Sequence, residues 1–438
     1  MSIWAKARSL AEKAPPERNR YVDFLRAFSI LAVVIGHWLV AAPYIDASGE
    51  VVGGHLLGIL PWSQWLTWGF QVMPLFFLVG GFSNGVSWAA QKRDGKPYSA
   101  WFASRIQRLI NPVFPVLLFW AALTFVGTQA GLDRDVVNMA AQLALIPVWF
   151  LAVYLFITAL TPIAHAAWQR FGWGSIAALV LAAVAVDIAR IGYAVAFIGW
   201  ANFAFVWLAV HQLGFAWGNG ELNRGNRPWL FLATWLSVLI ALVTALPYPI
   251  AMIGVPGADL SNSMPPTLAL LSLGFAQAGL ALGLEKAGRR MLDNIQIWTG
   301  VVLMNGMIMT VYLWHLTAFV AVLVAAWLLG GIGLDAYPGT GEWWLARPVW
   351  FALYIATLLP LIAIFARYER GSALDGKPLP HWQLVLGLVL ISLGLAMTAA
   401  ISIASPEGVS GVRLWVVALP LVGAALVGFG PVAKWLRS

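Results

Sequence analysis

Long apolar stretches constrain this chain more than any other feature of its sequence. A helix needs about 17–25 apolar residues to cross a bilayer, and stretches of this kind recur along all 438 residues. We place twelve of them, at about 22–42, 65–88, 110–128, 139–163, 174–189, 194–217, 229–247, 266–284, 299–328, 348–366, 383–404 and 413–432. Only 10% of the residues are charged, against about 25% in a typical soluble domain. The sequence predicts an all-α polytopic membrane protein.

The basic residues predict the orientation of these spans. With the N-terminus inside, the inner segments (the leader through Arg26, loops 91–108, 164–173, 218–228, 285–294 and 367–380, and the tail after 432) hold 22 of the 26 Lys and Arg residues. The other four are Arg134, Arg190, Arg347 and Arg413. Cytoplasmic loops of membrane proteins carry such an excess of Lys and Arg. We therefore expect both termini in the cytoplasm, and topology rather than nucleic-acid binding explains the net charge of +8.

The sequence lacks the residues and motifs that several kinds of catalytic and metal site require. The chain has no cysteine, which excludes disulfides, thiolate nucleophiles and Cys-ligated metals. It also lacks a phosphate-binding G-x-x-x-x-G-K-[ST] loop, a G-x-S-x-G elbow and an H-E-x-x-H motif. We therefore predict no metal site. Residues 1–20 form a basic leader that we expect to be retained at the membrane surface, since no A-x-A cleavage site follows.

Charged residues within spans are costly and are candidates for function. Asp23, Arg26 and His37 lie in or beside the first span, and at 100° per residue all three share one helix face. Arg26 and His37 would be about 16 Å apart along the axis. A purely structural alternative stays open. In it, Asp23 and Arg26 form an i,i+3 pair at the cytoplasmic boundary, and His37 only hydrogen-bonds a neighbouring helix.

Two further groups of polar residues stand out. Arg105 and Arg108 are spaced R-x-x-R at the entry to the third span, a spacing that can present two guanidinium groups to one phosphate; ordinary retention of positive charge is the alternative. Tyr312 and His315 lie one turn apart in the stretch 299–328, and Asn305 lies two turns earlier. His211 is a weaker candidate, and we expect the remaining histidines to be structural.

Four motifs in order resemble the acyltransferase-3 family of integral membrane acyltransferases. They are Arg20-Tyr-Val-Asp23-Phe-Leu-Arg26-Ala-Phe with an R-x10-H arrangement ending at His37, Met73-Pro-Leu-Phe-Phe-Leu-Val-Gly-Gly-Phe82, Arg105-x-x-Arg108, and Val311-Tyr-Leu-Trp-His315. Gly80 stands where the family usually has Ser. The resemblance implies a basic leader at 1–20, a core of about ten helices at 21–367, and two additional C-terminal transmembrane helices at 368–438.

The resemblance also implies an activity. Such enzymes transfer an acyl group, commonly acetyl from cytoplasmic acetyl-CoA, to a hydroxyl of an envelope glycan, glycolipid or small molecule at the inner (plasma) membrane. His37 would be the general base or a transient acyl carrier, with Arg26 and Asp23 keeping its surroundings polar. Tyr312 and His315 would assist, and Arg105 with Arg108 would hold the CoA phosphates. The implied partners are acyl-CoA, a hydroxyl-bearing glycan or lipid, and membrane lipid, with no permanently bound cofactor.

Two other classes of protein remain open from the sequence. A secondary transporter or lipid flippase also commonly has twelve helices, although the matching broken helices of paired halves are absent. A non-catalytic membrane scaffold is the third class. It would gain stability by losing the charged residues of the first span, which argues against it.

Overall fold

The computed structural model describes residues 2–15, 17–369, 379–405, 407 and 409–435. Helices dominate these ranges, and the one strand pair within them is the short antiparallel hairpin of β1 (Tyr44–Ile45) and β2 (Val51–Val52). The predicted all-α polytopic membrane fold is confirmed. The chain ends Met1 and Ser438, which we expect in the cytoplasm, lie outside the described residues, as does most of the loop 367–380.

The chain divides into two compact units, each described here by itself. The first unit comprises Met1–Pro43, Gly53–Ala90 and Leu160–Gly306. Its helices are α1 (Ile3–Glu12), α2 (Arg20–Val40), α3 (Leu56–Ile59), η1 (Pro61–Leu66), α4 (Thr67–Phe70), most of α5 (Met73–Arg93), α10 (Thr161–Phe171), α11 (Trp173–Asp187), η2 (Ile188–Gly192), η3 (Ile198–Ala201), α12 (Asn202–Gly218), α13 (Arg227–Ala245), α14 (Leu268–Gly283), α15 (Glu285–Met291) and α16 (Ile295–Asn305).

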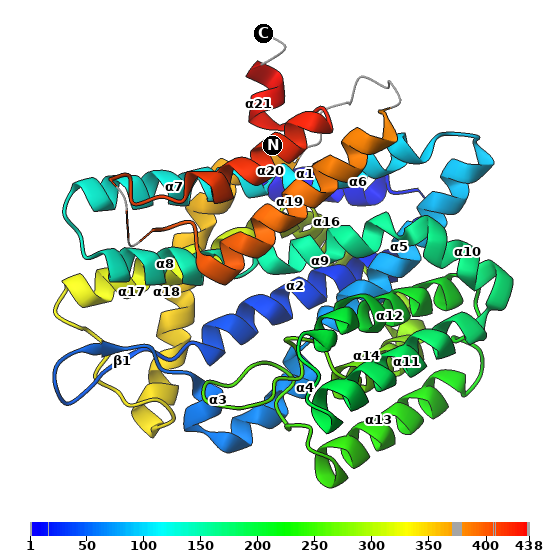
Figure 1. The fold of residues 1–438 in the computed structure, drawn as a ribbon, viewed down its shortest axis with the longest axis horizontal. Helices are drawn as coiled ribbons and strands as arrows, with labels where there is room; N and C mark the ends of the chain where they lie inside the picture. The colour runs from blue at the N-terminus through cyan, green and yellow to red at the C-terminus, as the bar shows by residue number, and fades with distance from the viewer. Residues whose placement is uncertain (1, 16, 370–378, 406, 408, 436–438) are drawn as a thin grey trace. The chain divides into compact units, whose positions relative to one another are not determined.

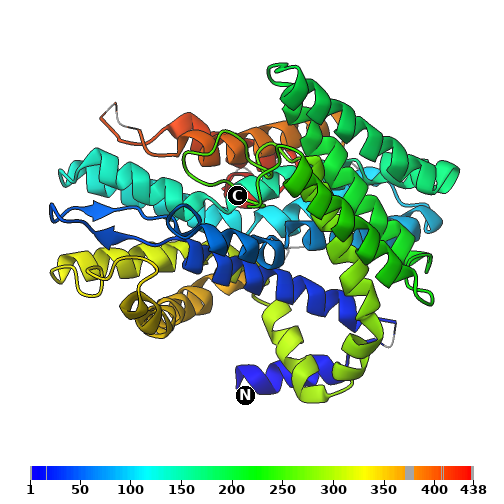
Figure 2. The same cartoon turned by 90° about the horizontal axis from the view of Figure 1, so that it is seen from below.

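Within the first unit, α13 packs along α14, and α12 packs against both α11 and α14 (Figure 1). Helix α2 packs on α16 and α15, and also contacts α3 and α4. The leader helix α1 lies beside α16 (Figure 2). Ala7 and Ala11 are buried on its inner face, and the indole Nε1 of Trp298 donates to the carbonyl oxygen of Ala11 at 3.2 Å.

The second unit comprises Tyr44–Val52, Gln91–Ala159 and Met307–Ser438. Besides the hairpin it contains α6 (Tyr98–Ile110), α7 (Val113–Gln129), α8 (Arg134–Leu145), α9 (Val148–Ala159), α17 (Ile308–Leu328), α18 (Gly341–Phe365), η4 (Ala366–Glu369), α19 (His381–Ile401), α20 (Leu414–Leu426) and α21 (Gly430–Trp435). Helix α17 packs against α18 and α8, and α19 packs against α20 and α9. The two additional C-terminal helices are therefore packed on earlier helices of this unit.

The described helices account for most of the predicted spans. Eight are long and apolar enough to cross a membrane, or ten if each of two bent pairs, α6 with α7 and α14 with α15, forms one span. The stretch 194–217 corresponds to the 17-residue α12, and the last stretch to the 13-residue α20. The number twelve therefore includes α12, whose length is at the lower end of the range for a spanning helix, and α20, which is shorter than that range.

The stretch 299–328 is not one helix, which corrects the sequence-based interpretation. Helix α16 ends at Asn305, and α17 begins at Ile308 after Gly306 and Met307. Gly306 favours such a break because glycine is a poor helix former. Asn305 therefore does not share a helix with Tyr312 and belongs to the first unit.

Close contact between backbones fixes α5 against α12. A Cβ atom on Gly81 would lie 1.8 Å from the carbonyl oxygen of His211, and one on Gly214 would lie 2.3 Å from the amide nitrogen of Phe82. Only glycine allows this approach. Beside the crossing, the Asn84 Nδ2 lies 3.3 Å from the Nε2 of the fully buried His211. This contact gives His211 a packing role, and the crossing holds α5 in place for the site below.

Candidate functional site

The first two turns of α2 carry the charged residues of the first motif. Asn19 caps the helix, and its Oδ1 accepts hydrogen bonds from the backbone amides of Tyr21 and Val22 at 3.2 and 3.3 Å. Such a cap satisfies amides that have no partner within the helix. Asp23 lies in this turn, where the positive end of the helix dipole favours a carboxylate.

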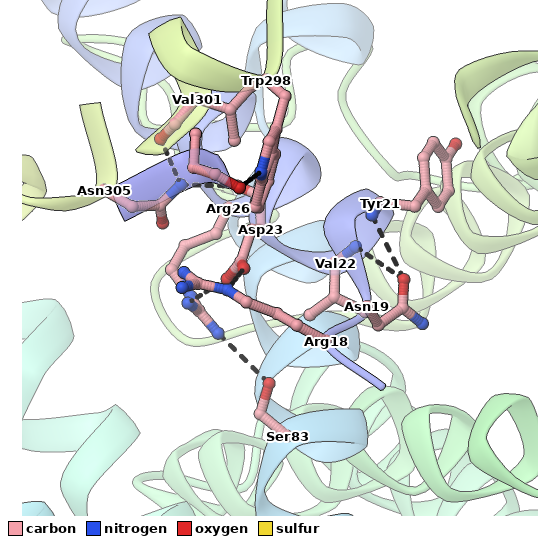
Figure 3. Close-up of polar contacts among 11 residues, drawn as sticks. Arg18, Asn19, Tyr21, Val22, Asp23, Arg26, Ser83, Trp298, Val301 and Asn305 are labelled. Carbon is pink, nitrogen blue, oxygen red and sulfur yellow. Dashed lines mark hydrogen bonds and ion pairs between the residues drawn. The ribbon is translucent and has the colours of Figure 1, made fainter. Parts of the chain in front are cut away.

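The carboxylate of Asp23 binds two guanidinium groups (Figure 3). Its Oδ2 lies 2.6 Å from the Nε of Arg18, and its Oδ1 lies 3.0 Å from the Nη1 of Arg26. The Asp23 side chain is 10% exposed, whereas those of Arg18 and Arg26 are 40% and 30% exposed. Two cations share one buried anion, so the cluster has one positive charge in excess.

Two neighbouring helices hold this cluster in place. The Nη2 of Arg26 donates to the hydroxyl of Ser83 on α5 at 3.2 Å. The Nδ2 of Asn305, the last residue of α16, donates to the backbone carbonyl of Asp23 at 2.9 Å (Figure 3). The sequence placed Asn305 with His315, and the structure places it with Asp23.

A tryptophan supports the arginines from the side. The fully buried Trp298 has the guanidinium carbons of Arg18 and Arg20 at 5.4 and 5.2 Å from its ring centroid. Cations over an indole ring at this distance are attracted to it by about 0.5–2 kcal/mol. Arg20 also donates from Nη1 to the carbonyl of Leu292 at 3.1 Å. Trp298 therefore orders the arginine-rich segment that leads into α2.

A cavity of about 500 Å³ opens beside the Asp23 cluster. It is lined by Glu17, Arg18, Asn19, Val22, Asp23, Arg26, Phe82, Ser83, Val86, Ser87 and Arg289. Three guanidinium groups face two carboxylates in this lining, together with two hydroxyls and an amide. Guanidinium groups and hydroxyls are the donors that proteins use to bind phosphate, so the cavity has the chemistry of an anion-binding site.

Arg289, the third arginine that lines the cavity, is held by the carboxylate of Glu285 on the same helix. Arg289 donates from Nε and Nη2 to the Oε1 of Glu285 at 2.9 and 2.6 Å. The other oxygen of Glu285 accepts from the indole Nε1 of Trp217 at 3.1 Å and the Nδ2 of Asn223 at 3.3 Å. These bonds on both oxygens hold Glu285 and place Arg289 at the cavity.

His37 lies at the other end of α2. The helix is continuous from Arg20 to Val40, so His37 stands about 16 Å along the axis from Arg26. The His37 side chain is half-buried, while its neighbour Trp38 is buried. The polar residues predicted on one face of this helix are thus divided between a charged end at the cavity and an imidazole near its last turn.

Arg105 and Arg108 lie one turn apart on α6, in the second unit. Arg105 is half-buried, with its guanidinium carbon 5.7 Å from the ring centroid of Trp101. Arg108 is exposed. The predicted R-x-x-R spacing therefore forms on a helix, and the two residues differ in burial.

Tyr312 and His315 are both buried on α17, in the second unit. The Tyr312 hydroxyl donates to the carbonyl of Pro147 at 2.7 Å, between α8 and α9. The Nδ1 of His315 lies 2.6 Å from the carbonyl oxygen of Tyr312. A carbonyl can only accept, so Nδ1 carries the proton, and Nε2 is the basic nitrogen of the neutral ring.

Sequence reasoning identified Asp23 and Arg26 but missed Arg18, Ser83 and Arg289. Arg18 was attributed to the leader and Arg289 to a cytoplasmic loop. Ser83 follows directly after the motif that ends at Phe82 and was not singled out. The density of arginine around the start of the first span, at positions 18, 20 and 26, is the available signal for Arg18.

Comparison with known proteins supports one family. The sequence model of the acyltransferase-3 family, described as an acyltransferase domain, matches residues 19–367. No curated protein and no solved structure matches the chain. The match spans most of the 438 residues, and the chain belongs to the acyltransferase-3 family. It is a membrane acyltransferase.

Proposed function

We propose that this protein transfers an acyl group, most simply acetyl, from cytoplasmic acyl-CoA to a hydroxyl of an envelope glycan, glycolipid or small molecule. The observation that carries the proposal is the cavity beside Asp23 at the start of α2, the helix that also bears His37. Membership of an acyltransferase family favours this reading over a transporter, a flippase or a scaffold.

The cavity is suited to the nucleotide end of the donor. Acyl-CoA carries several phosphate oxygens, and Arg18, Arg26 and Arg289 line the cavity. Arg18 and Arg26 share one carboxylate, so a phosphate can bind the donors that Asp23 leaves unused. An extended pantetheine arm would then carry the thioester along α2 toward His37.

The chemistry requires a base near the thioester. In the proposed step the acceptor oxygen attacks the thioester carbonyl carbon, a C–O bond forms and the C–S bond breaks. The imidazole of His37 takes the hydroxyl proton and passes it to the departing sulfur, which leaves as free CoA thiol. Imidazole suits this role because its ordinary pKa lies near neutral pH.

Arg105 and Arg108 provide a second proposed contact for the donor phosphates. The two guanidinium groups lie one turn apart on α6, and each charge-assisted contact to a phosphate contributes about 1.5–3 kcal/mol. In this proposal His315 assists from α17 with its Nε2 nitrogen, and Tyr312 fixes that helix to the junction of α8 and α9.

The absence of cysteine makes the test direct. Purified full-length protein is given acetyl-CoA and candidate acceptors, and released thiol is measured with a thiol-reactive dye, to which the chain itself contributes no signal. We expect thiol release that rises with acceptor and equals the ester formed. The absence of acceptor-dependent release with every hydroxyl-bearing acceptor class would contradict the proposal.

The acceptor itself can be identified in cells. Mass spectrometry of envelope lipids, glycans and small molecules compares the wild type with a deletion strain and with the deletion strain carrying His37→Gln. A species that loses one acyl mass in both mutant strains identifies the donor group and the acceptor together.

A further inference from the structure

Arg347 on α18 is the most thoroughly buried arginine of the described chain. Its residue is 7% exposed, and its guanidinium carbon lies 4.2 Å from the ring centroid of Trp343 and 5.4 Å from that of Trp350. Its one hydrogen bond in the described structure runs from Nε to the Trp343 carbonyl at 3.3 Å. It forms no ion pair with the described residues.

A second donor beside Arg347 is also unsatisfied. The indole Nε1 of Trp343 is buried, and it has no hydrogen-bond partner among the described residues. A buried donor without an acceptor lowers stability, and the loss is larger if the donor is charged. Attraction to two indole rings offsets only part of the free-energy cost of burying a cation. Among the described residues, the Trp343 carbonyl accepts one hydrogen bond from Arg347, and the Tyr354 phenol on the same helix interacts electrostatically with Arg347. The site therefore has donors in excess of its acceptors.

The other three basic residues predicted on the outer side differ from Arg347. Arg413 donates to the carbonyls of Ile401, Ser402 and Ala404. Arg190 donates to the Pro265 carbonyl at 3.4 Å and lies near the carboxylate of Asp187. Arg134 is exposed. Of these four arginines, Arg347 alone is buried and has no oxygen partner beyond its own helix among the residues that the structure describes.

Rigid elements hold the site. A Cβ atom on Gly333, whose φ is +78°, would lie 3.1 Å from the Trp350 ring, so the loop after α17 packs on that ring. The amide of Ile45 in β1 donates to the Leu334 carbonyl in the same loop at 2.8 Å. The loop is therefore tied to the hairpin and packs on one of the two indole rings beside Arg347.

We propose that Arg347 and Trp343 form a subsite for an anionic oxygen group, a carboxylate or phosphate, on the acceptor. This inference rests on the proposed function, and it assigns the acceptor to the class of acidic glycans or anionic lipids. A guanidinium fork matches either group with two parallel hydrogen bonds. The indole N–H of Trp343 adds a third donor.

The test measures binding, so its failure and the failure of acyl transfer are distinguishable. In detergent, the dissociation constants of p-nitrophenyl β-glucuronide and p-nitrophenyl β-xyloside are compared, since these probes share their ring hydroxyls and differ in the carboxylate. In nanodiscs, phosphatidylglycerol is compared with phosphatidylcholine by thermal stabilisation of the protein. The first arm reports an acidic sugar, and the second reports a lipid headgroup.

We expect the wild type to prefer the anionic member of at least one pair by about tenfold, the equivalent of about 1.4 kcal/mol. Arg347→Gln should abolish this preference, and Arg347→Lys should retain part of it by keeping the charge without the fork. The control Arg134→Gln removes a charge from the same predicted side and should keep the full preference. Equal binding of both members in both arms, or a preference that survives in folded Arg347→Gln protein, would overturn the subsite.

Discussion

Two regions of the molecule pair their buried polar groups with different kinds of partner. One is the charged cluster at the start of α2, and the other is the pair Tyr312 and His315 on α17. Around Asp23, side chains bind side chains, with two guanidinium groups on one carboxylate beside a cavity of about 500 Å³. On α17, the buried Tyr312 and His315 hydrogen-bond to backbone carbonyls. One cluster adjoins open space, and the other is enclosed by protein.

This difference indicates that the α2 cluster can bind an anion, whereas the polar residues of α17 hold their helix in position. Ion pairs beside a cavity can redistribute when an anion enters, because Arg18 and Arg26 have donors beyond those that Asp23 occupies. A hydrogen bond from a buried phenol to a main-chain carbonyl offers no such exchange, and its loss leaves the carbonyl unsatisfied. We therefore expect substitutions near α2 to change catalysis and donor binding, and substitutions on α17 to act mainly through geometry.

The largest effect is expected at His37. His37→Gln keeps a hydrogen-bonding amide but cannot take the proton, so acyl transfer should fall by about 10²–10⁴-fold. His315→Gln, on α17, should retain measurable activity. Thiol release from acetyl-CoA with saturating acceptor measures both. Substantial turnover by folded His37→Gln protein, with none from His315→Gln, would move the base to α17.

The next effect is expected on stability. Asp23→Asn leaves the guanidinium groups of Arg18 and Arg26 without their carboxylate. Removing one partner of a buried pair costs about 3–5 kcal/mol, and the partial exposure of both arginines reduces this to about 1–3 kcal/mol.

Thermal unfolding of the two detergent-purified variants Asp23→Asn and Glu12→Gln measures the difference. Glu12→Gln breaks the pair of Arg8 with Glu12, in which both side chains are 54% exposed, and it should change stability by about 0.5 kcal/mol or less. Equal destabilisation by the two substitutions would contradict the structural role of the Asp23 cluster.

The paired arginines of α6 come third. Arg105→Ala/Arg108→Ala should raise the apparent constant for acyl-CoA at least about tenfold, because two phosphate contacts are lost. Lys92→Ala/Lys96→Ala removes the same charge from two exposed positions, in the last turn of α5 and in the loop that follows it, and should have little effect. The apparent constant is measured by steady-state kinetics at varied acyl-CoA concentration. Unchanged donor affinity in the Arg105→Ala/Arg108→Ala variant would refute the proposed contact of this pair with the donor phosphates.

The smallest effect is expected at Tyr312. Tyr312→Phe removes the hydrogen bond to the Pro147 carbonyl and should lower stability by about 1 kcal/mol, with catalysis reduced only slightly. Unfolding and thiol release are measured on the same preparation. A loss of activity as large as that of His37→Gln, at unchanged stability, would give the phenol a direct chemical role.

Local spacing predicted the parts of the site that one helix supplies. The separation of three residues between Asp23 and Arg26 predicted neighbours, and their side chains meet at 3.0 Å. The R-x-x-R pair likewise lies on one helix. Ser83 and Arg289 could not be found in this way, because they reach the cavity from helices far along the chain, and no periodicity within one segment encodes such an approach.

Hydropathy also could not reveal the break after Asn305. Gly306 and Met307 continue the apolar profile, so 299–328 reads as one long span, although the backbone leaves the helix there. Asn305 was consequently grouped with His315. The hydrogen bond of its side chain to the Asp23 carbonyl depends on how α16 packs on α2, which a one-dimensional pattern does not contain.

The cavity beside Asp23 is proposed to hold the phosphates of acyl-CoA, and a comparison of two acyl donors tests this proposal. Acetyl-CoA carries these phosphates, and S-acetylpantetheine carries the same thioester without them. Arg18→Gln leaves Asp23 paired with Arg26 and should lower kcat/KM for acetyl-CoA by about tenfold, or about 1.4 kcal/mol, while kcat/KM for S-acetylpantetheine stays near the wild-type value. An equal change for both donors, or none for acetyl-CoA, would contradict the claim.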